Sequence, residues 1–242
     1  MTSIATNLQA VKDRIRAVCQ AQGRAAEAVA LLAVSKTWPA DSVRAAAACG
    51  QRAFGENYVQ EAVDKIAALA DLNLEWHFIG PLQANKTKLV ATHFDWVHSI
   101  ERLKIAERLS LQRPDHLPPL QVCIQVNVSG EQSKSGCAPE EAEDLALAVA
   151  SLPRLQLRGL MAIPEPTEDL ALLTSRFASL RILSERLKAH GLALDTLSMG
   201  MSHDLETAIA AGATIVRVGT AIFGERHYPT HNQGNESPER PT

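Results

Sequence analysis

The sequence predicts an α/β protein, a single TIM-type (β/α)8 barrel preceded by an extra amino-terminal helix. Short apolar runs typical of buried strands alternate eight times with stretches of helical spacing, which implies parallel strands joined by right-handed crossovers. These units spread over about 190 residues, a length that suits such a barrel. A doubly wound open sheet has the same alternation and is the alternative fold.

The amino-terminal helix is expected over residues 3–22, where apolar side chains from Ile4 to Val18 recur at helical spacing. The first strand follows at residues 29–34, an almost unbroken apolar run typical of a strand buried on both faces. The later strands are expected at residues 52–55, 74–79, 96–99, 120–128, 155–163, 194–198 and 214–218. The helices between them are expected at residues 39–49, 59–70, 86–91, 103–111, 139–151, 169–189 and 202–211. Residues 1–226 thus form one domain, and residues 227–242, polar and rich in proline, are expected to be a mobile tail.

Charge and composition exclude several classes of function. The net charge is −3 and the chain has no Lys/Arg run, which argues against nucleic acid or an acidic membrane as the main partner. No apolar run is long enough to span a bilayer, and the amino terminus lacks the apolar core of a signal peptide. The four cysteines are Cys19, Cys49, Cys123 and Cys137. They show no paired CxxC spacing, which favours reduced thiols and a cytoplasmic protein.

Lys36 stands at the carboxyl end of the first predicted strand, where the apolar run gives way to Ser35-Lys36-Thr37. Ligands of parallel α/β folds bind at this edge, because the strand-to-helix loops converge there. A lone lysine at the end of a strand is most often solvated, so the residues around Lys36 decide whether it is interpreted as a ligand-binding residue. The other polar or notable residues expected at this edge are Asn57, His77, Ser99, Asn127, Met161, Ser198 to Ser202, and Arg217 to Thr220.

The last two strand-to-helix loops have the composition of a phosphate site. Barrels of this type often bind phosphate there, through backbone N–H groups. Ser202 is expected to cap the helix that follows, and Gly219 lets the backbone approach a ligand closely. A simple helix cap and a tight turn are the alternative interpretation. Asp204 and Glu206 would repel a phosphate unless they point outward.

A strand-end lysine and a phosphate cradle are together suited to pyridoxal 5′-phosphate (PLP). The lysine forms a Schiff base with the aldehyde, and the cradle holds the phosphate. Arg217 is a candidate partner for the pyridine nitrogen. A cation at that position disfavours protonation of the ring, and an unprotonated ring is a poorer electron sink. The residues therefore predict PLP binding with weakened carbanion chemistry.

Seven sequence blocks, spread from about residue 29 to residue 226, resemble the signature of the pyridoxal phosphate homeostasis protein family. They are Val34-Ser-Lys-Thr37, Phe54-Gly-Glu-Asn-Tyr-Val-Gln-Glu61, His77-Phe-Ile-Gly-Pro-Leu-Gln-Ala-Asn-Lys86, Asn127-Val-Ser-Gly-Glu-Gln-Ser-Lys-Ser-Gly136, Gly159-Leu-Met161, Ser198-Met-Gly-Met-Ser-His-Asp204 and Arg217-Val-Gly-Thr-Ala-Ile-Phe-Gly224. The resemblance implies a barrel similar to the amino-terminal domain of alanine racemase. It implies these roles: Lys36 as the Schiff-base residue, Arg217 at the ring nitrogen, Ser202, Gly219 and Thr220 at the phosphate, and Asn57 beside the ring.

The same resemblance implies a protein of vitamin B6 homeostasis that lacks robust catalysis and meets apo forms of PLP-dependent enzymes. A racemase needs proton donors on both faces of the substrate carbon, a lysine on one face and a tyrosine on the other in the related racemases. This chain has two tyrosines that could take the second role, Tyr58 and Tyr228. Some family members carry a second lysine two residues after the first, which offers a transfer route for PLP. Trp38 stands at that position here, so this route is in question, and with it the role of Lys134 in the polar loop. No second domain is expected after the barrel, so a monomer is predicted. A PLP-dependent amino-acid racemase or lyase is the alternative function, and the histidine spacing predicts no metal site.

Overall fold

The computed structural model describes residues 3–130 and 135–225. Eight parallel strands in this part of the chain pair in sequence order, and the ring closes because β1 pairs with β8. The closed ring confirms the TIM-type barrel and excludes the open sheet. The strands are β1 (Ala30–Val34), β2 (Ala53–Glu56), β3 (Glu75–Phe78), β4 (Trp96–Ile100), β5 (Leu120–Gln125), β6 (Leu155–Met161), β7 (Thr196–Ser198) and β8 (Ile215–Val218).

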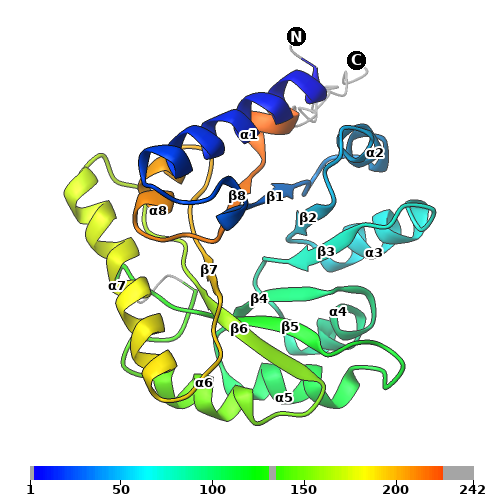
Figure 1. The fold of residues 1–242 in the computed structure, drawn as a ribbon. Helices are drawn as coiled ribbons and strands as arrows, with labels where there is room; N and C mark the ends of the chain where they lie inside the picture. The colour runs from blue at the N-terminus through cyan, green and yellow to red at the C-terminus, as the bar shows by residue number, and fades with distance from the viewer. Residues whose placement is uncertain (1–2, 131–134, 226–242) are drawn as a thin grey trace, which may run out of the picture.

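Helices surround the ring of strands (Figure 1). Within the described residues they are α1 (Ile4–Ala21), α2 (Ala40–Ala48), α3 (Val59–Ala68), α4 (Thr87–His93), α5 (Leu103–Gln112), α6 (Ala142–Ala150), α7 (Leu170–Ala189), α8 (Leu205–Ala210) and α9 (Thr220–Phe223). None of these helices is both long and apolar enough to cross a membrane. The tail expected at residues 227–242 lies outside the described residues.

The extra amino-terminal helix, α1, is confirmed. The Ser3 hydroxyl caps it by accepting a hydrogen bond from the Thr6 N–H at 3.2 Å. Its buried stripe, which includes Leu8 and Ile15, packs against α8 and α9. The Asn7 side-chain amide also donates to the Ile222 carbonyl oxygen of α9 at 3.0 Å. The helix therefore fixes the two short helices that follow β7 and β8.

Two apolar layers separate the inside of the barrel from its outer shell. Alternate residues of each strand face opposite sides, and Ala33 packs in the large cluster between strands and helices. Its neighbours Leu32 and Val34 instead pack with Ile79 and Ile215 in a small inner cluster. This inner cluster does not fill the barrel. Buried polar side chains, among them His77, His98, Ser198 and Arg217, occupy part of the remaining interior.

Two helix starts differ from the sequence prediction. The helix expected from residue 139 begins at Ala142, because Pro139 lies in a turn before it. The helix expected from residue 202 begins at Leu205, with Asp204 rather than Ser202 at its N-cap position. The four-residue helix α9 was not predicted. In each case the strand before the loop is where the apolar pattern predicts it.

Candidate functional site

Lys36 is the second residue after β1 and is partly buried. The chain turns sharply here, since Thr37 has a φ of 68°, in a left-handed region that β-branched residues rarely adopt. The Trp38 N–H closes the turn by donating to the Ser35 carbonyl oxygen at 3.0 Å. The structure thus places Lys36 in a tight turn at the carboxyl-terminal mouth of the barrel.

The Gly219 turn lies directly against the end of β1. β8 pairs with β1 up to Val218, and Gly219 follows at once. A Cβ atom at Gly219 would lie 3.1 Å from the Val34 carbonyl oxygen and 3.4 Å from the Val34 Cβ. A larger residue would crowd this contact, so glycine allows the approach. Residues far apart in sequence, Lys36 and Gly219, therefore share one corner of the mouth.

Thr220, the first residue of α9, is exposed beside this corner. The Trp38 ring stacks on Phe223, with ring centroids 5.8 Å apart and planes inclined by 29°. This contact joins the chain just after Lys36 to α9. The glycine turn, Thr220 and the lysine turn are consequently held as one unit.

Arg217 of β8 lies inside the barrel and is 3% exposed. Its Nη1 donates to the Ser198 carbonyl oxygen at 2.6 Å and to the Ser198 hydroxyl at 2.8 Å, while Nη2 donates to the Ala162 carbonyl oxygen at 3.0 Å. Burial lowers the pKa of the guanidinium to about 10, which still leaves it charged near neutral pH. No carboxylate in the described residues forms an ion pair with it, although the charge of Asp204 acts on it from farther away and opposes the lowering of its pKa. Arg217 is thus a rigid buried cation held by neutral acceptors.

Asn57 follows β2 at the same mouth. The Asn57 backbone lies very close to Gly80, the residue that follows β3 by two positions. A Cβ atom on Gly80 would lie 2.5 Å from the Asn57 carbonyl oxygen. Among the described side chains, three buried oxygen atoms have no hydrogen-bond partner: Asn57 Oδ1, Ser99 Oγ and Glu56 Oε2. All three belong to residues at the carboxyl ends of β2 and β4. Such unpaired buried groups are costly, and a ligand that donates a hydrogen bond at the mouth can satisfy the Asn57 oxygen.

The loop between β7 and α8 carries Ser202, which is partly buried and is not a helix cap. Asp204 takes that position, and its carboxylate accepts a hydrogen bond from the Met201 N–H. Glu206 pairs with Arg14 of α1 at 2.7 Å, and Arg14 also donates to the Ser202 carbonyl oxygen at 3.2 Å. The ion pair with Arg14 offsets the charge of Glu206, which weakens its repulsion of a phosphate at this loop, whereas Asp204 keeps its charge against a neutral N–H group.

A buried ionic cluster, which the sequence motifs did not predict, holds the lysine turn from the side of α3. Lys65 Nζ donates to the Ser35 carbonyl oxygen at 2.8 Å, to Glu56 at 2.6 Å and to Glu61 at 2.9 Å. The Ser35 hydroxyl donates to Glu56 at 2.6 Å, and the Thr37 N–H donates to Glu61 at 2.6 Å. The spacing of Glu61 and Lys65, four residues apart on a predicted helix, is the sequence signal that could have indicated it.

Burial dominates the electrostatics of this cluster. It raises the pKa of the Glu56 carboxyl, and the charge of Lys65 opposes that rise. Glu56 has no exposed surface and Lys65 is 5% exposed. Neither buried charge is stable without the other. Because Glu56 and Lys65 also hold the hydroxyl and the carbonyl oxygen of Ser35, the cluster fixes the turn that carries Lys36.

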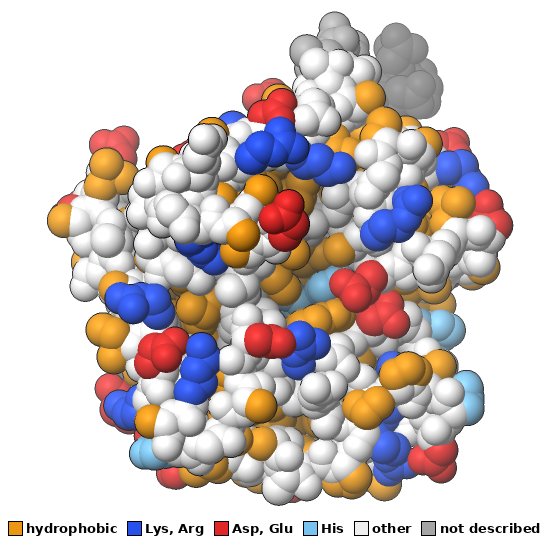
Figure 2. All heavy atoms as spheres, viewed as in Figure 1, with side chains coloured by type: hydrophobic (Ala, Val, Ile, Leu, Met, Phe, Trp, Pro, Cys, Tyr) orange, Lys and Arg blue, Asp and Glu red, His pale blue; other side chains and the backbone are white. Residues whose placement is uncertain are grey.

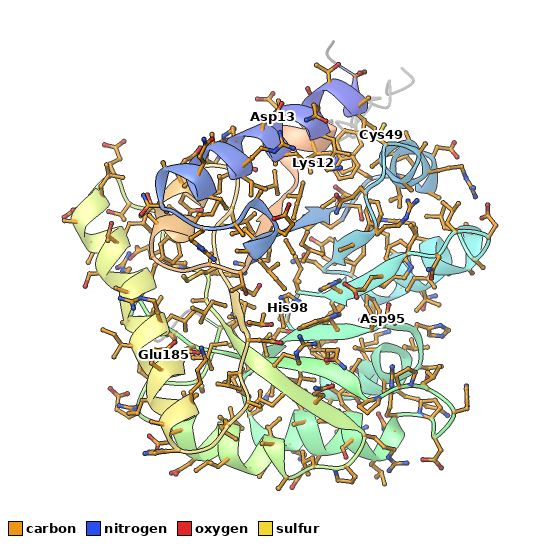
Figure 3. All side chains as sticks on the ribbon, in the orientation of Figure 1. Lys12, Asp13, Cys49, Asp95, His98 and Glu185 are labelled. Carbon is orange, nitrogen blue, oxygen red and sulfur yellow. The ribbon has the colours of Figure 1, made fainter. Side chains whose placement is uncertain are left out.

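His77 does not lie at the carboxyl-terminal mouth, where the strand pattern predicted it. It belongs to β3 and is buried inside the barrel, where Nδ1 contacts His98 Nε2 at 2.9 Å. Figure 3 shows the labelled His98 within the ring of strands. No sequence spacing signals this pair, since the two residues meet across neighbouring strands. Lys134 and Tyr228 lie outside the described residues.

The family comparison agrees with this architecture. Residues 6–227 match the family model of the alanine racemase N-terminal domain. The alanine racemase of Corynebacterium glutamicum has a TM-score of 0.66 at 20% identity, and the match covers 92% of this chain and 61% of the racemase. At this identity the likeness is one of fold. The fold and the lysine turn thus define a barrel of the alanine racemase N-terminal class.

More similar relatives narrow the class. The pyridoxal phosphate homeostasis protein of Pseudomonas aeruginosa is 63% identical over 228 residues, covering 94% of this chain and 98% of the relative. The protein of the same name in Escherichia coli is 55% identical over 231 residues, covering 94% and 99%. The chain belongs to the family of pyridoxal phosphate homeostasis proteins.

PipY of Synechococcus elongatus has been solved in two forms. The form without PLP has a TM-score of 0.82 at 39% identity, and the form with PLP bound has a TM-score of 0.80 at 38% identity. Each match covers 92% of this chain and 100% of the PipY chain.

Proposed function

We propose that this chain binds PLP at the carboxyl-terminal mouth of the barrel and holds it as a Schiff base on Lys36. The observation that carries the proposal is the meeting of the Lys36 turn with the Gly219 turn, next to the strand that supplies the buried Arg217. The PLP-bound structure of PipY, at 38% identity, supports the same ligand here.

The residues at the mouth fit this cofactor. Lys36 supplies the amine, whose nitrogen joins the aldehyde carbon while the aldehyde oxygen leaves as water. Ser202, Gly219 and Thr220 line the two loops assigned to the phosphate. Asn57 Oδ1, a buried acceptor without a partner in the described residues, is a polar contact available to the bound molecule.

Arg217 is assigned to the pyridine nitrogen. Three of its N–H groups are held by Ser198 and Ala162, and the N–H on Nε and one on Nη2 make no hydrogen bond within the described residues. PLP supplies an electron-withdrawing ring when bound. A permanent cation at the ring nitrogen keeps that ring unprotonated and so limits its power as an electron sink.

This arrangement supports a regulator or carrier rather than an efficient enzyme. The Tyr58 side chain is 54% exposed, so it is not held rigidly as a second proton donor opposite the lysine. We assign the chain to PLP and vitamin B6 homeostasis inside the cell, with apo forms of PLP-dependent enzymes as recipients. Residues 1–226 act as one monomeric binding domain in this proposal.

Lys36→Ala tests the covalent attachment. Wild-type protein incubated with PLP is expected to show an absorbance band near the visible edge that borohydride abolishes. The Lys36→Ala variant is expected to lack the band, whereas Lys104→Ala, which removes an exposed lysine from α5, keeps it. An unchanged band in Lys36→Ala would contradict the assignment.

A PLP-dependent racemase or lyase is the second candidate, and one observation favours it. Ser99 Oγ, near the carboxyl end of β4, is buried without a partner among the described residues, so its hydroxyl is available to contact a bound substrate. Incubation of the PLP-loaded protein with each L-amino acid, followed by assays for the D-enantiomer and for lyase products, separates the two. Turnover of about 1 per second or more would favour the enzyme.

A further inference from the structure

A chain of hydrogen bonds crosses the inside of the barrel and ends on Arg217. Glu75 contacts His77 Nε2 at 2.7 Å, and His77 Nδ1 contacts His98 Nε2 at 2.9 Å. His98 Nδ1 contacts the Ser198 hydroxyl at 2.8 Å, and Arg217 donates to the same hydroxyl at 2.8 Å. His77, His98 and Ser198 are all buried. Four strands therefore contribute to one continuous path.

The far end of this path opens on the opposite face of the barrel. The Glu75 side chain is 50% exposed. Glu75 and His77 line a cavity of about 270 Å³ at the amino-terminal ends of the strands. Figure 2 shows a hollow near the centre of one face, with charged side chains around it. The titratable groups around His77 are Glu75 of the same strand, Asp95 before β4, His98 of β4, Arg158 of β6 and Asp195 before β7.

The ends of the chain set its direction. Arginine can only donate a hydrogen bond, and an ionised carboxylate can only accept one. With both imidazoles neutral, one arrangement satisfies every contact. The Ser198 hydroxyl donates to His98 Nδ1, His98 Nε2–H donates to His77 Nδ1, and His77 Nε2–H donates to Glu75. The bond from His77 lowers the pKa of Glu75, which keeps the carboxylate in its accepting form.

One added proton on His77 reverses this direction. A protonated His77 donates from both nitrogens, so His98 Nε2 must accept and its proton must lie on Nδ1. His98 then donates to Ser198, and the serine hydroxyl hydrogen turns away. The Ser198 oxygen now accepts from His98 and from Arg217 through its two lone pairs, and its own hydrogen must find another acceptor. The polarity of the hydroxyl that Arg217 contacts is thereby changed.

We propose that His77 and His98 are positioning residues for the cofactor site. His77 lies toward the amino-terminal end of the barrel, and its protonation state sets how Ser198 holds Arg217 against bound PLP. This inference rests on the proposed function. The Trp96 ring stacks on His77 with centroids 5.3 Å apart and planes 7° apart, which holds the imidazole in the geometry that the path requires.

Nitrogen-15 NMR of the histidine rings tests the path without PLP. We expect His98 to carry its proton on Nε2 at high pH and on Nδ1 once His77 is protonated. In Glu75→Gln the pH profile of the His98 tautomer should differ from that of wild type, because the carboxylate that contacts His77 Nε2 is gone. A His98 tautomer that stays the same from pH 5 to 8.5 would overturn the proposal.

A pH titration of the absorbance band of the PLP-loaded protein tests the link to the cofactor. Wild-type protein should show a pH-dependent shift of the band with the midpoint found by NMR. His77→Gln should keep the band and lose the shift, because glutamine cannot take up the proton. His116→Gln, which changes an exposed histidine, should match wild type.

Identical titrations of wild type and His77→Gln would overturn the coupling while leaving PLP binding intact. Absence of the band from wild-type protein would instead contradict the proposed function, and the coupling with it. The NMR result would still decide whether the hydrogen-bonded path exists.

Discussion

Lys65 carries a charge into a part of the protein where Glu56 and Glu61 balance it. Its three acceptors lie on the turn that holds Lys36 and on the two carboxylates, so one ammonium group ties β1, β2 and α3 together. The individual bonds are ordinary in length. Their importance comes from the burial of Lys65 and Glu56, which are almost completely shielded from the water that could replace a lost partner.

Lys65→Met is expected to lower the free energy of unfolding by about 3–5 kcal/mol, because it leaves the buried Glu56 carboxylate unpaired. Urea denaturation followed by circular dichroism measures the change. The double variant Lys65→Met, Glu56→Gln should recover part of the loss. Arg44→Ala, which breaks an exposed ion pair with Asp71, is the matched control and should hardly move the midpoint. Equal effects of Lys65→Met and Arg44→Ala would contradict the role of the cluster.

His98 makes the stability depend on pH. Desolvation first, and then the charges of His77 and Arg217, lower its pKa well below the ordinary value of 6.5. Below pH 6.5 the unfolded chain binds a proton that the folded protein excludes, so the free energy of unfolding falls as the pH falls. The slope from this group is at most about 1.4 kcal/mol per pH unit.

Denaturation at pH values from 5 to 8 measures this slope. His98→Gln should flatten it below pH 6.5, whatever its effect on stability at neutral pH. His116→Gln is the control and should keep the wild-type slope. If the slope survives in His98→Gln, another group is responsible and the burial of a neutral His98 is not the cause.

At the scale of the elements, the apolar patterns predict every strand of the barrel within a few residues. Continuous apolar runs such as residues 29–34 are sufficient, since both faces of each strand are covered. Helix starts were less predictable, because local signals compete. Ser202 has the residue type of a cap, yet the Asp204 carboxylate binds the Met201 N–H and delays the helix. That competition depends on loop geometry, which sequence spacing does not contain.

Close approach of β6 and β7 depends on Gly159. A Cβ atom there would overlap the Thr196 carbonyl oxygen, which is backbone and cannot move aside. Gly159→Ala is therefore expected to destabilise the barrel by about 1–3 kcal/mol or more. Gly55→Ala is the control, because its Cβ would meet only flexible side-chain atoms of Ile79 and Leu32, the nearest at 3.2 Å. Thermal or urea unfolding should show a clearly larger loss for Gly159→Ala, and the reverse order would contradict this account.

At the scale of the whole molecule, closure of the ring creates the site. Pairing of β1 with β8 brings Lys36 to Gly219 and Arg217, which are more than half the chain away in sequence. The sequence predicts this meeting once eight strand and helix units are recognised, because closure follows from the count. It does not predict the His77–His98 contact or the Lys65 cluster. Both depend on which side chains turn inward at a given register, and a one-residue change in register would separate them.

The central claim is that one lysine, Lys36, carries the cofactor. Borohydride reduction of the PLP-loaded protein, followed by proteolysis and peptide mass spectrometry, tests it most directly. The account predicts that the reduced phosphopyridoxyl group lies on the peptide containing Lys36, with little label on any other lysine. Label on Lys65 or on exposed lysines such as Lys104, with Lys36 unmodified, would contradict it.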